Sequence, residues 1–323
     1  MKRALLMLLA AAIVGTGATP TDAEAATKKK AVAKKAVAAN KKVQRSAKQA
    51  RVKQTFGVKS AHRGLSLDDA RHLALQSSGV LVQDQTTGAI LFEKNPDVVL
   101  PIASITKLMT AMVVLDAKPD LSETLVIGEE DVDILKGTRS RLKVGTHLAR
   151  EEMLRLALMS SENRAAAALS RHYPGGREAF VAAMNQKAQA LGLADTRFQD
   201  PTGLTAANVS SPRDLAKMVD AAHQYPLIRE YSTTSEGEFS IAGRPQHFRN
   251  TNTLVKSPTW EIGLSKTGYI SEAGKCLVMQ AWLNNKPTII VLLDSWGKMT
   301  RIGDANRIKR WVESASLGRP SAG

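Results

Sequence analysis

From residue 64 onward, hydrophobic and polar positions follow two different periods, which predicts strands near both ends of the domain and helices between them. Short apolar runs bounded by turn residues predict strands over residues 79–85, 89–92, 263–270, 276–283 and 288–293. Apolar positions repeating every three or four residues predict helices over residues 104–116, 151–159, 164–172, 177–191, 212–225 and 305–314. A sheet that unites the two ends of the domain, with helices packed on it, is typical of an α/β or α+β fold.

The helix predicted over residues 104–116 differs from the others because it is apolar on most sides. Leu108, Met109, Met112, Val113 and Leu115 do not fall on one stripe. A helix of this kind is buried in the middle of a fold rather than laid on its surface. Turn sequences at residues 86–88 and 284–287 predict two β-hairpins, one near each end of the domain.

The charge of the chain is concentrated in one segment. The 323 residues carry a formal net charge of +15, and residues 26–63 supply thirteen Lys or Arg with no acidic residue. The remaining chain is nearly neutral, so the basicity belongs to a linker that buries too little apolar surface to fold. This segment is either an electrostatic contact to an anionic wall or membrane surface, or a spacer without specificity. Phe56 is its one aromatic residue, so we expect no nucleic-acid partner.

The first 25 residues have the order of a secretory signal peptide. Lys2 and Arg3 precede the apolar stretch 4–14, and Ala23-Glu24-Ala25 provides a cleavage site. The alternative is an uncleaved anchor or a buried first helix. The sequence therefore predicts export to the periplasm and four segments: a signal peptide (1–25), a basic disordered linker (26–63), a catalytic domain (64–318) and a short tail (319–323). Cys276 is the single cysteine and lies in an apolar run, so we expect a buried, inert thiol.

A candidate nucleophile opens the apolar helix. Ser104 and Lys107 are three residues apart, which places both side chains on one helix face. A lysine kept neutral by its environment can remove the proton of a neighbouring hydroxyl, and the helix N-terminus favours negative charge there. Two further pairs with this spacing, Ser140…Lys143 in the strand-like run 139–144 and Ser295…Lys298 in a predicted loop, lack helical geometry and are expected to be chance matches.

Two more polar motifs follow along the chain. Ser161-Glu162-Asn163 comes directly after a predicted helix, where its hydroxyl and carboxamide can point into a cleft, although both residue types are also common helix caps. Lys266-Thr267-Gly268 lies within a predicted strand. A glycine in a strand marks close approach of a ligand or of another backbone. The lysine and the threonine beside it can hold a carboxylate, although an ordinary edge strand has the same composition.

Ser-x-x-Lys, Ser-x-Asn and Lys-Thr-Gly, in this order across one domain, are the active-site set of penicillin-binding proteins and serine β-lactamases. The runs PIASITKLMTAMVVLDA, LALMSSENRAAAAL, FRNTN and LSKTGYI extend the similarity over about residues 78–315. The chain resembles the penicillin-binding protein 7 type of D-alanyl-D-alanine endopeptidase. The resemblance implies a mostly antiparallel central sheet flanked by helices, with a helical subdomain.

The resemblance also implies a role for each motif residue. Ser104 is the acylated nucleophile and Lys107 its base, while Ser161 relays a proton to the leaving amine and Asn163 holds the substrate amide. Lys266 contributes positive potential, and Thr267 binds a carboxylate. Gly268 lies at the substrate, and the backbone N–H groups of Ser104 and Tyr269 form the oxyanion hole. Arg301, beyond the last predicted strand, is a further candidate for binding a carboxylate.

The function implied is hydrolysis of D-alanyl bonds in peptidoglycan, with β-lactams as inhibitors. Endopeptidase cleavage of D-Ala-diaminopimelate cross-links is the preferred reaction, and carboxypeptidase removal of a terminal D-alanine is the alternative. A non-catalytic β-lactam-sensing or wall-binding module is the alternative outside the enzymes. No Glu-x-x-Leu-Asn segment is present, which disfavours a β-lactamase. About fifty residues follow Lys-Thr-Gly, so we expect no second β-rich domain and no terminal amphipathic anchor. The six histidines are scattered, and neither a metal nor another cofactor is expected.

Overall fold

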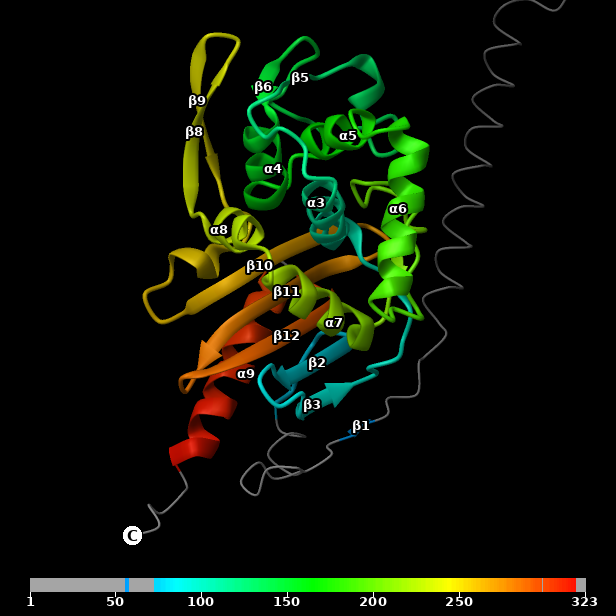
Figure 1. Cartoon of the computed structure of the whole chain (residues 1–323). Helices are drawn as coiled ribbons and strands as arrows, with labels where there is room; N and C mark the ends of the chain where they lie inside the picture. Colours follow the sequence, from blue (N-terminus) through cyan, green and yellow to red (C-terminus); the bar gives the residue numbers. More distant parts are fainter. Residues whose placement is uncertain (1–55, 58–72, 298, 318–323) are drawn as a thin grey trace, which may run out of the picture. The chain divides into compact units, whose positions relative to one another are not determined.

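The computed structural model describes residues 56–57, 73–297 and 299–317. Its main element is a sheet in which every neighbouring pair of strands is antiparallel, in the order β1-β3-β2-β12-β11-β10 (Figure 1). The strands are β1 (Phe56–Gly57), β2 (Gly79–Asp84), β3 (Ile90–Lys94), β10 (Glu261–Ile270), β11 (Gly274–Leu283) and β12 (Lys286–Ser295). The first and last strands of the domain thus share one sheet, which confirms the arrangement expected from the sequence.

Helices cover both faces of this sheet (Figure 1). The helices are α3 (Thr106–Asp116), α4 (Arg150–Met159), α5 (Asn163–Arg171), α6 (Gly176–Ala190), α7 (Pro212–His223), α8 (Pro226–Thr233) and α9 (Thr300–Leu317). Three short 3₁₀ turns are η1 (Ala103–Ile105), η2 (Glu129–Asp131) and η3 (Thr253–Lys256). The paired short strands are β4 (Leu100–Pro101) with β7 (Val209–Ser210), β5 (Thr124–Val126) with β6 (His147–Ala149), and β8 (Glu236–Ile241) with β9 (Arg244–Arg249).

The strand side chains divide between two cores. Val80 and Val82 pack in the core that includes Trp311 of α9, whereas Leu81 belongs to the core formed with α3 to α8. A strand covered on both faces needs apolar residues at every position, which is why the strand sequences read as unbroken apolar runs. The fold class expected from the sequence, a helix-flanked antiparallel sheet with a helical subdomain, is confirmed.

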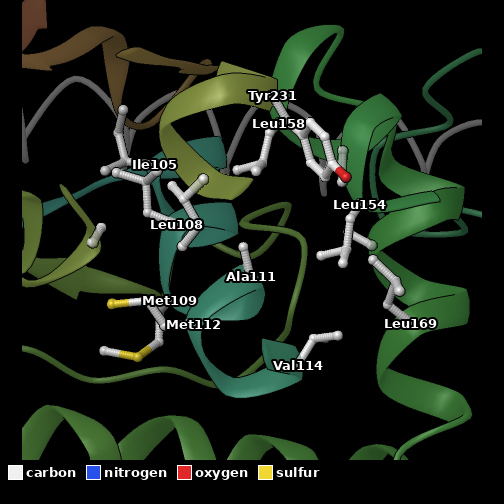
Figure 2. Packing of buried hydrophobic residues seen from close by; sticks show 14 of the residues in the cluster. Ile105, Leu108, Met109, Ala111, Met112, Val114, Leu154, Leu158, Leu169 and Tyr231 are labelled. Atoms are coloured by element: carbon white, nitrogen blue, oxygen red, sulfur yellow. The ribbon is translucent and has the colours of Figure 1, made fainter. Parts of the chain in front are cut away.

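Helix α3 lies in the middle of the helical layer, as its apolar character on most sides predicts. Residues 106–114 are all buried. Figure 2 shows Leu108 and Met112 among side chains that include Leu154 and Leu158 of α4 and Tyr231 of α8. Because α3 is fixed on several sides, the residues at its N-terminal end are held firmly in place.

The structure corrects three local expectations. Residues 139–144 do not form a strand, because their backbone is bonded to side chains: Leu142 N–H donates to Ser140 Oγ, and Arg164 donates to the Leu142 carbonyl. Ser295 is the last residue of β12, not part of a loop. Helix α8 and the β8–β9 hairpin were not expected. The apolar repeat that predicts α7 stops before Pro226. The same proline is the first residue of α8, because proline fits the first turn of a helix.

The signal peptide and all of the basic linker except β1 lie outside the described residues, so both stay predictions. Phe56 and Gly57 pair with Lys94 and Glu93 of β3. Among the described residues, no helix combines the length and apolar character needed to cross a membrane.

Candidate active site

Ser104 and Lys107 lie where η1 passes directly into α3. Lys107 Nζ donates to Ser104 Oγ at 2.9 Å. Ala103, the residue before the serine, has φ +47°, a left-handed conformation that turns the chain sharply into the helix. The three-residue spacing therefore brings hydroxyl and amine into direct contact at the entrance of the buried helix.

Burial determines the protonation of Lys107. Its side chain is inaccessible to solvent, and its Nζ also donates to Asn163 Oδ1 at 2.8 Å and to the Thr202 carbonyl at 2.6 Å. Desolvation lowers the pKa of Lys107 to about 7, although the negative charges of Asp200 and Glu162 act against this shift. Near neutral pH a large fraction of the protein thus carries an uncharged amine, whose lone pair can accept a hydrogen bond from the Ser104 hydroxyl.

Ser161 and Asn163 come from the junction between α4 and α5. Ser161 has φ +62°, a conformation that non-glycine residues seldom adopt, and its Oγ accepts from Lys266 Nζ at 2.9 Å. Asn163 begins α5 and uses both ends of its carboxamide: Oδ1 accepts from Lys107, and Nδ2 donates to Thr138 Oγ1 at 3.1 Å. The strained turn points the serine toward the edge strand of the sheet.

That edge strand is β10, which carries the third motif. Lys266 is buried, and its pKa is well below the usual value because of desolvation and the nearby positive charges of Lys107 and Arg301. Thr267 Oγ1 donates to Thr251 Oγ1 at 2.6 Å. A Cβ at Gly268 would lie 2.7 Å from the Ile102 carbonyl oxygen and 3.3 Å from Ser104 N. Only glycine lets the strand approach Ser104 so closely, which gives the glycine of this motif a physical reason.

A fourth segment, the loop of residues 200–205, was not found from the sequence. The Asp200 carboxylate accepts from the backbone N–H groups of Thr202, Gly203 and Thr205 at 2.5–2.8 Å. Gly203 has φ +82°, and a Cβ there would lie 2.0 Å from the Ala103 carbonyl oxygen. The loop thus packs on the turn that carries the serine, and it supplies the carbonyl that holds Lys107. An Asp-Pro-Thr-Gly turn sequence is the signal that would have drawn attention to it.

Tyr269 and Arg301 lie at the same end of β10. Tyr269 pairs with Lys275, and its side chain is largely exposed. Arg301, on α9, donates to the carbonyl oxygens of Gly268 at 3.1 Å and Cys276 at 3.3 Å, and burial lowers its pKa. The guanidinium supports the backbone of the Lys-Thr-Gly strand, and its binding of a carboxylate stays a prediction.

The serines of the two chance Ser-x-x-Lys matches, and the single cysteine, lie in other environments. Ser140 Oγ donates to Glu162, and Ser295 Oγ bonds to Ser77 Oγ at 2.6 Å. Cys276 is buried, as expected, and burial raises the pKa of its thiol to about 12. Within the described ranges, no group of three His, Cys, Asp or Glu residues is placed to hold a metal ion.

A pocket of about 460 Å³, measured with its open mouth, lies beside Asn163. Its lining includes Asp133, Leu135 and Thr202. Asn163 is the motif residue that lines this pocket. It is bonded to Lys107, which also contacts Ser104, while Ser161 is bonded to Lys266. This arrangement can transfer an acyl group to a serine without a metal ion.

Comparison with known proteins gives consistent results. The family model for D-alanyl-D-alanine carboxypeptidase, Peptidase S11, matches residues 66–297. The chain is 51% identical to a D-alanyl-D-alanine endopeptidase of Pseudomonas aeruginosa (75% of this chain, 79% of the relative) and 48% identical to one of Escherichia coli (81% and 85%). Among solved structures, the Streptomyces K15 DD-transpeptidase is similar with a TM-score of 0.70 at 28% identity, over 75% of this chain and 98% of that protein.

Proposed function

Because the chain belongs to the D-alanyl-D-alanine carboxypeptidase family, Peptidase S11, we propose that it is an endopeptidase that cuts D-alanyl cross-links in peptidoglycan through an acyl-enzyme on Ser104. The family makes the chain a serine D,D-peptidase, and the resemblance to the penicillin-binding protein 7 type is confirmed by the two endopeptidases at 51% and 48% identity. The observation that carries the assignment of Ser104 is its contact with the buried Lys107, whose pKa is about 7.

In the first half of the proposed reaction, Ser104 Oγ attacks the carbonyl carbon of D-alanine and its proton passes to the neutral Lys107. The charge that develops on the carbonyl oxygen is stabilised by the backbone N–H groups of Ser104 and Tyr269. Ser161, bonded to Lys266, relays to the departing amine the proton that Lys107 took from Ser104. The first transfer needs donor and acceptor within hydrogen-bonding distance, and the separation of 2.9 Å between Lys107 Nζ and Ser104 Oγ meets that condition.

In the second half, water attacks the ester on Ser104 and releases the shortened peptide. A β-lactam acylates the same serine but leaves slowly, which makes it an inhibitor. Asn163 holds the amide of the acyl group, while Lys266, Thr267 and Gly268 face the leaving side. Arg301 adds positive charge behind that strand.

The choice of an endopeptidase over a carboxypeptidase rests on the relatives. The two relatives at about 50% identity are endopeptidases, whereas a D-alanyl-D-alanine carboxypeptidase of Bacillus subtilis is 33% identical over 68% of this chain and 58% of its own length. We also propose that the chain acts in the periplasm after removal of residues 1–25.

The deciding experiment incubates the purified mature protein with cross-linked peptidoglycan dimers and, separately, with pentapeptide monomers, and follows both by mass spectrometry. Loss of dimers with pentapeptides spared is the result expected. Release of D-alanine from pentapeptides with dimers spared would make the protein a carboxypeptidase. If neither substrate changes while penicillin still acylates Ser104, the protein is a β-lactam-sensing module instead.

A further inference from the structure

An ion pair joins the two sides of the site. Lys136 Nζ lies 2.6 Å from Glu272 Oε1. Lys136 belongs to the loop of residues 132–146, between η2 and β6, and Glu272 belongs to the turn between β10 and β11. The mechanism proposed above uses neither residue. The pair therefore requires an explanation of its own.

Both partners lie next to groups of the site. Thr138, two residues after Lys136, accepts the hydrogen bond from Asn163, and Glu272 follows Tyr269 by three residues. Strand β10 is extended to Ile270 and rises about 3.3 Å per residue, so this end of the strand lies about 13 Å from Lys266. If Lys266 faces the leaving amine, the ion pair lies on the side of the acyl donor.

Local hydrogen bonds hold the backbone around Lys136 and one carboxylate oxygen of Glu272. The Asp133 carboxylate accepts from the N–H groups of Leu135, Lys136 and Thr138 at 2.8–2.9 Å. Glu272 Oε2 accepts from Ser271 Oγ at 2.8 Å. The side chains of Lys136 and Glu272 are 29% and 32% exposed, and a pair so open to water contributes little to stability. A ligand with matching charges can replace it at small cost.

The surroundings define the chemistry of that ligand. A cation and an anion side by side match a zwitterion, with a carboxylate on Lys136 and an ammonium on Glu272. Leu135 directly precedes Lys136, and Tyr269 precedes Glu272 by three residues. They expose 66% and 61% of their surface and offer apolar contact to an alkyl chain. Leu135 also lines the pocket beside Asn163.

We infer that Lys136 and Glu272 bind the zwitterionic end of a diaminopimelate side chain, in the donor peptide, at the residue that precedes the scissile D-alanine. This inference rests on the proposed function and names a specificity determinant for it. The ion pair separates when the substrate enters, and each charge takes its opposite on the diamino acid.

The test uses three synthetic cross-linked peptides that differ only in the donor residue before the scissile D-alanine: diaminopimelate, lysine, which lacks the carboxylate, and norleucine, which lacks both charges. Each kcat/KM is divided by the same variant's rate constant of acylation by benzylpenicillin, so that a general loss of the nucleophile cancels. The wild type should favour diaminopimelate over norleucine by about tenfold or more, because diaminopimelate gains two charge-assisted contacts at a partly exposed site.

Single substitutions should remove separate parts of this preference. Lys136→Met should abolish the advantage of diaminopimelate over lysine, and Glu272→Gln the advantage of lysine over norleucine. The double variant Lys136→Glu/Glu272→Lys restores an ion pair with its charges exchanged. It should still lack the preference, since the stereocentre fixes where the ammonium lies. The matched control is Lys309→Met/Glu313→Gln, an ion pair on α9 of the opposite sheet face, which should keep the wild-type ratios.

Two results would overturn the inference alone: equal cleavage of all three peptides by the wild type, or recovery of the preference in the charge-exchanged variant, which is what a purely structural ion pair predicts. Failure to cleave any of the three, with acylation by benzylpenicillin intact, would instead overturn the peptidase function and this inference with it.

Discussion

The Nζ atom of Lys107 lies 2.9 Å from the Oγ atom of Ser104, inside a pocket of side chains that excludes water from the amine. The rate of acylation should therefore depend on pH. A lysine acts as a base only when neutral, and the neutral form predominates above its pKa, which is about 7 here. The rate constant of acylation by benzylpenicillin should fall about tenfold per pH unit below 7 and level off above it.

Stopped-flow or gel-based acylation between pH 5 and pH 9 provides this profile. Lys107→Arg is the matched control, because a guanidinium keeps a positive charge at the position but cannot lose its proton in this range. That variant should be inactive at every pH. An acylation rate that stays constant from pH 5 to pH 9 in the wild type would show that another group accepts the proton.

Ser104→Ala should abolish covalent labelling by penicillin while leaving the fold intact. Removing one hydroxyl at the start of α3 takes away a single hydrogen bond to Lys107, so we expect the melting temperature to change by a few degrees only. Labelling is measured with a fluorescent penicillin. Ser140→Ala, at another Ser-x-x-Lys match, should still be labelled; labelling of Ser104→Ala would mean that the nucleophile is assigned wrongly.

Most of the fold could be predicted from the sequence because its signals are local. The unbroken apolar runs of the strands and the apolar character of α3 follow from burial on several sides, and both appear in any short window of sequence. The three motifs were recognisable for the same reason. Each is a set of side chains within four residues, positioned by one helix, one turn or one strand.

The partners that complete the site could not be predicted, because they lie far apart along the chain. Lys107 is held by the carbonyl of Thr202, and a carbonyl group carries no side-chain signature. Thr138 contacts Asn163 across 25 residues. The strand predicted over residues 139–144 is wrong. Hydrophobic and polar positions alternate there as in a strand, but the backbone groups of Leu142 bond to the side chains of Ser140 and Arg164.

Asp200 should act on the reaction through Lys107. Its negative charge raises the pKa of Lys107 against the effect of burial, so Asp200→Asn should lower that pKa and move the acid limb of the acylation profile to lower pH. The variant also replaces the oxygen that accepts from Thr205 N–H, so its melting temperature should fall. A slower reaction with the limb unmoved would mean that Asp200 only holds the loop in place.

The basic linker should affect retention on the wall and not turnover. Residues 26–53 carry eleven Lys or Arg, and their deletion spares β1. The shortened protein should release from isolated sacculi at lower salt than the full mature chain, because electrostatic attachment is screened by ions. Its kcat/KM on soluble dimers should stay within about twofold of the value for the full mature chain, because the deletion removes none of the proposed site residues. A large loss of turnover on these small substrates would contradict a role as a tether.

Gly203 and Gly145 provide a matched pair that separates backbone strain from steric overlap. Both glycines are left-handed, with φ +82° and +81°, but a Cβ at 203 would lie 2.0 Å from the Ala103 carbonyl oxygen, whereas a Cβ at 145 meets no atom within 4 Å. Gly145→Ala should therefore cost only the left-handed penalty of about 1–2 kcal/mol and retain acylation. Gly203→Ala should cost the same left-handed penalty and should also displace the turn that carries Ser104.

A shift of about 1 Å at a nucleophile can cost roughly a hundredfold in rate, so Gly203→Ala should slow acylation by benzylpenicillin by at least that factor. It should also lower the free energy of unfolding by more than Gly145→Ala does, because backbone atoms cannot yield as a flexible side chain can. Chemical denaturation and acylation kinetics on the two variants measure both effects. Equal losses in the two would show that left-handed strain alone is responsible, and that the loop of residues 200–205 does not fix the position of the serine.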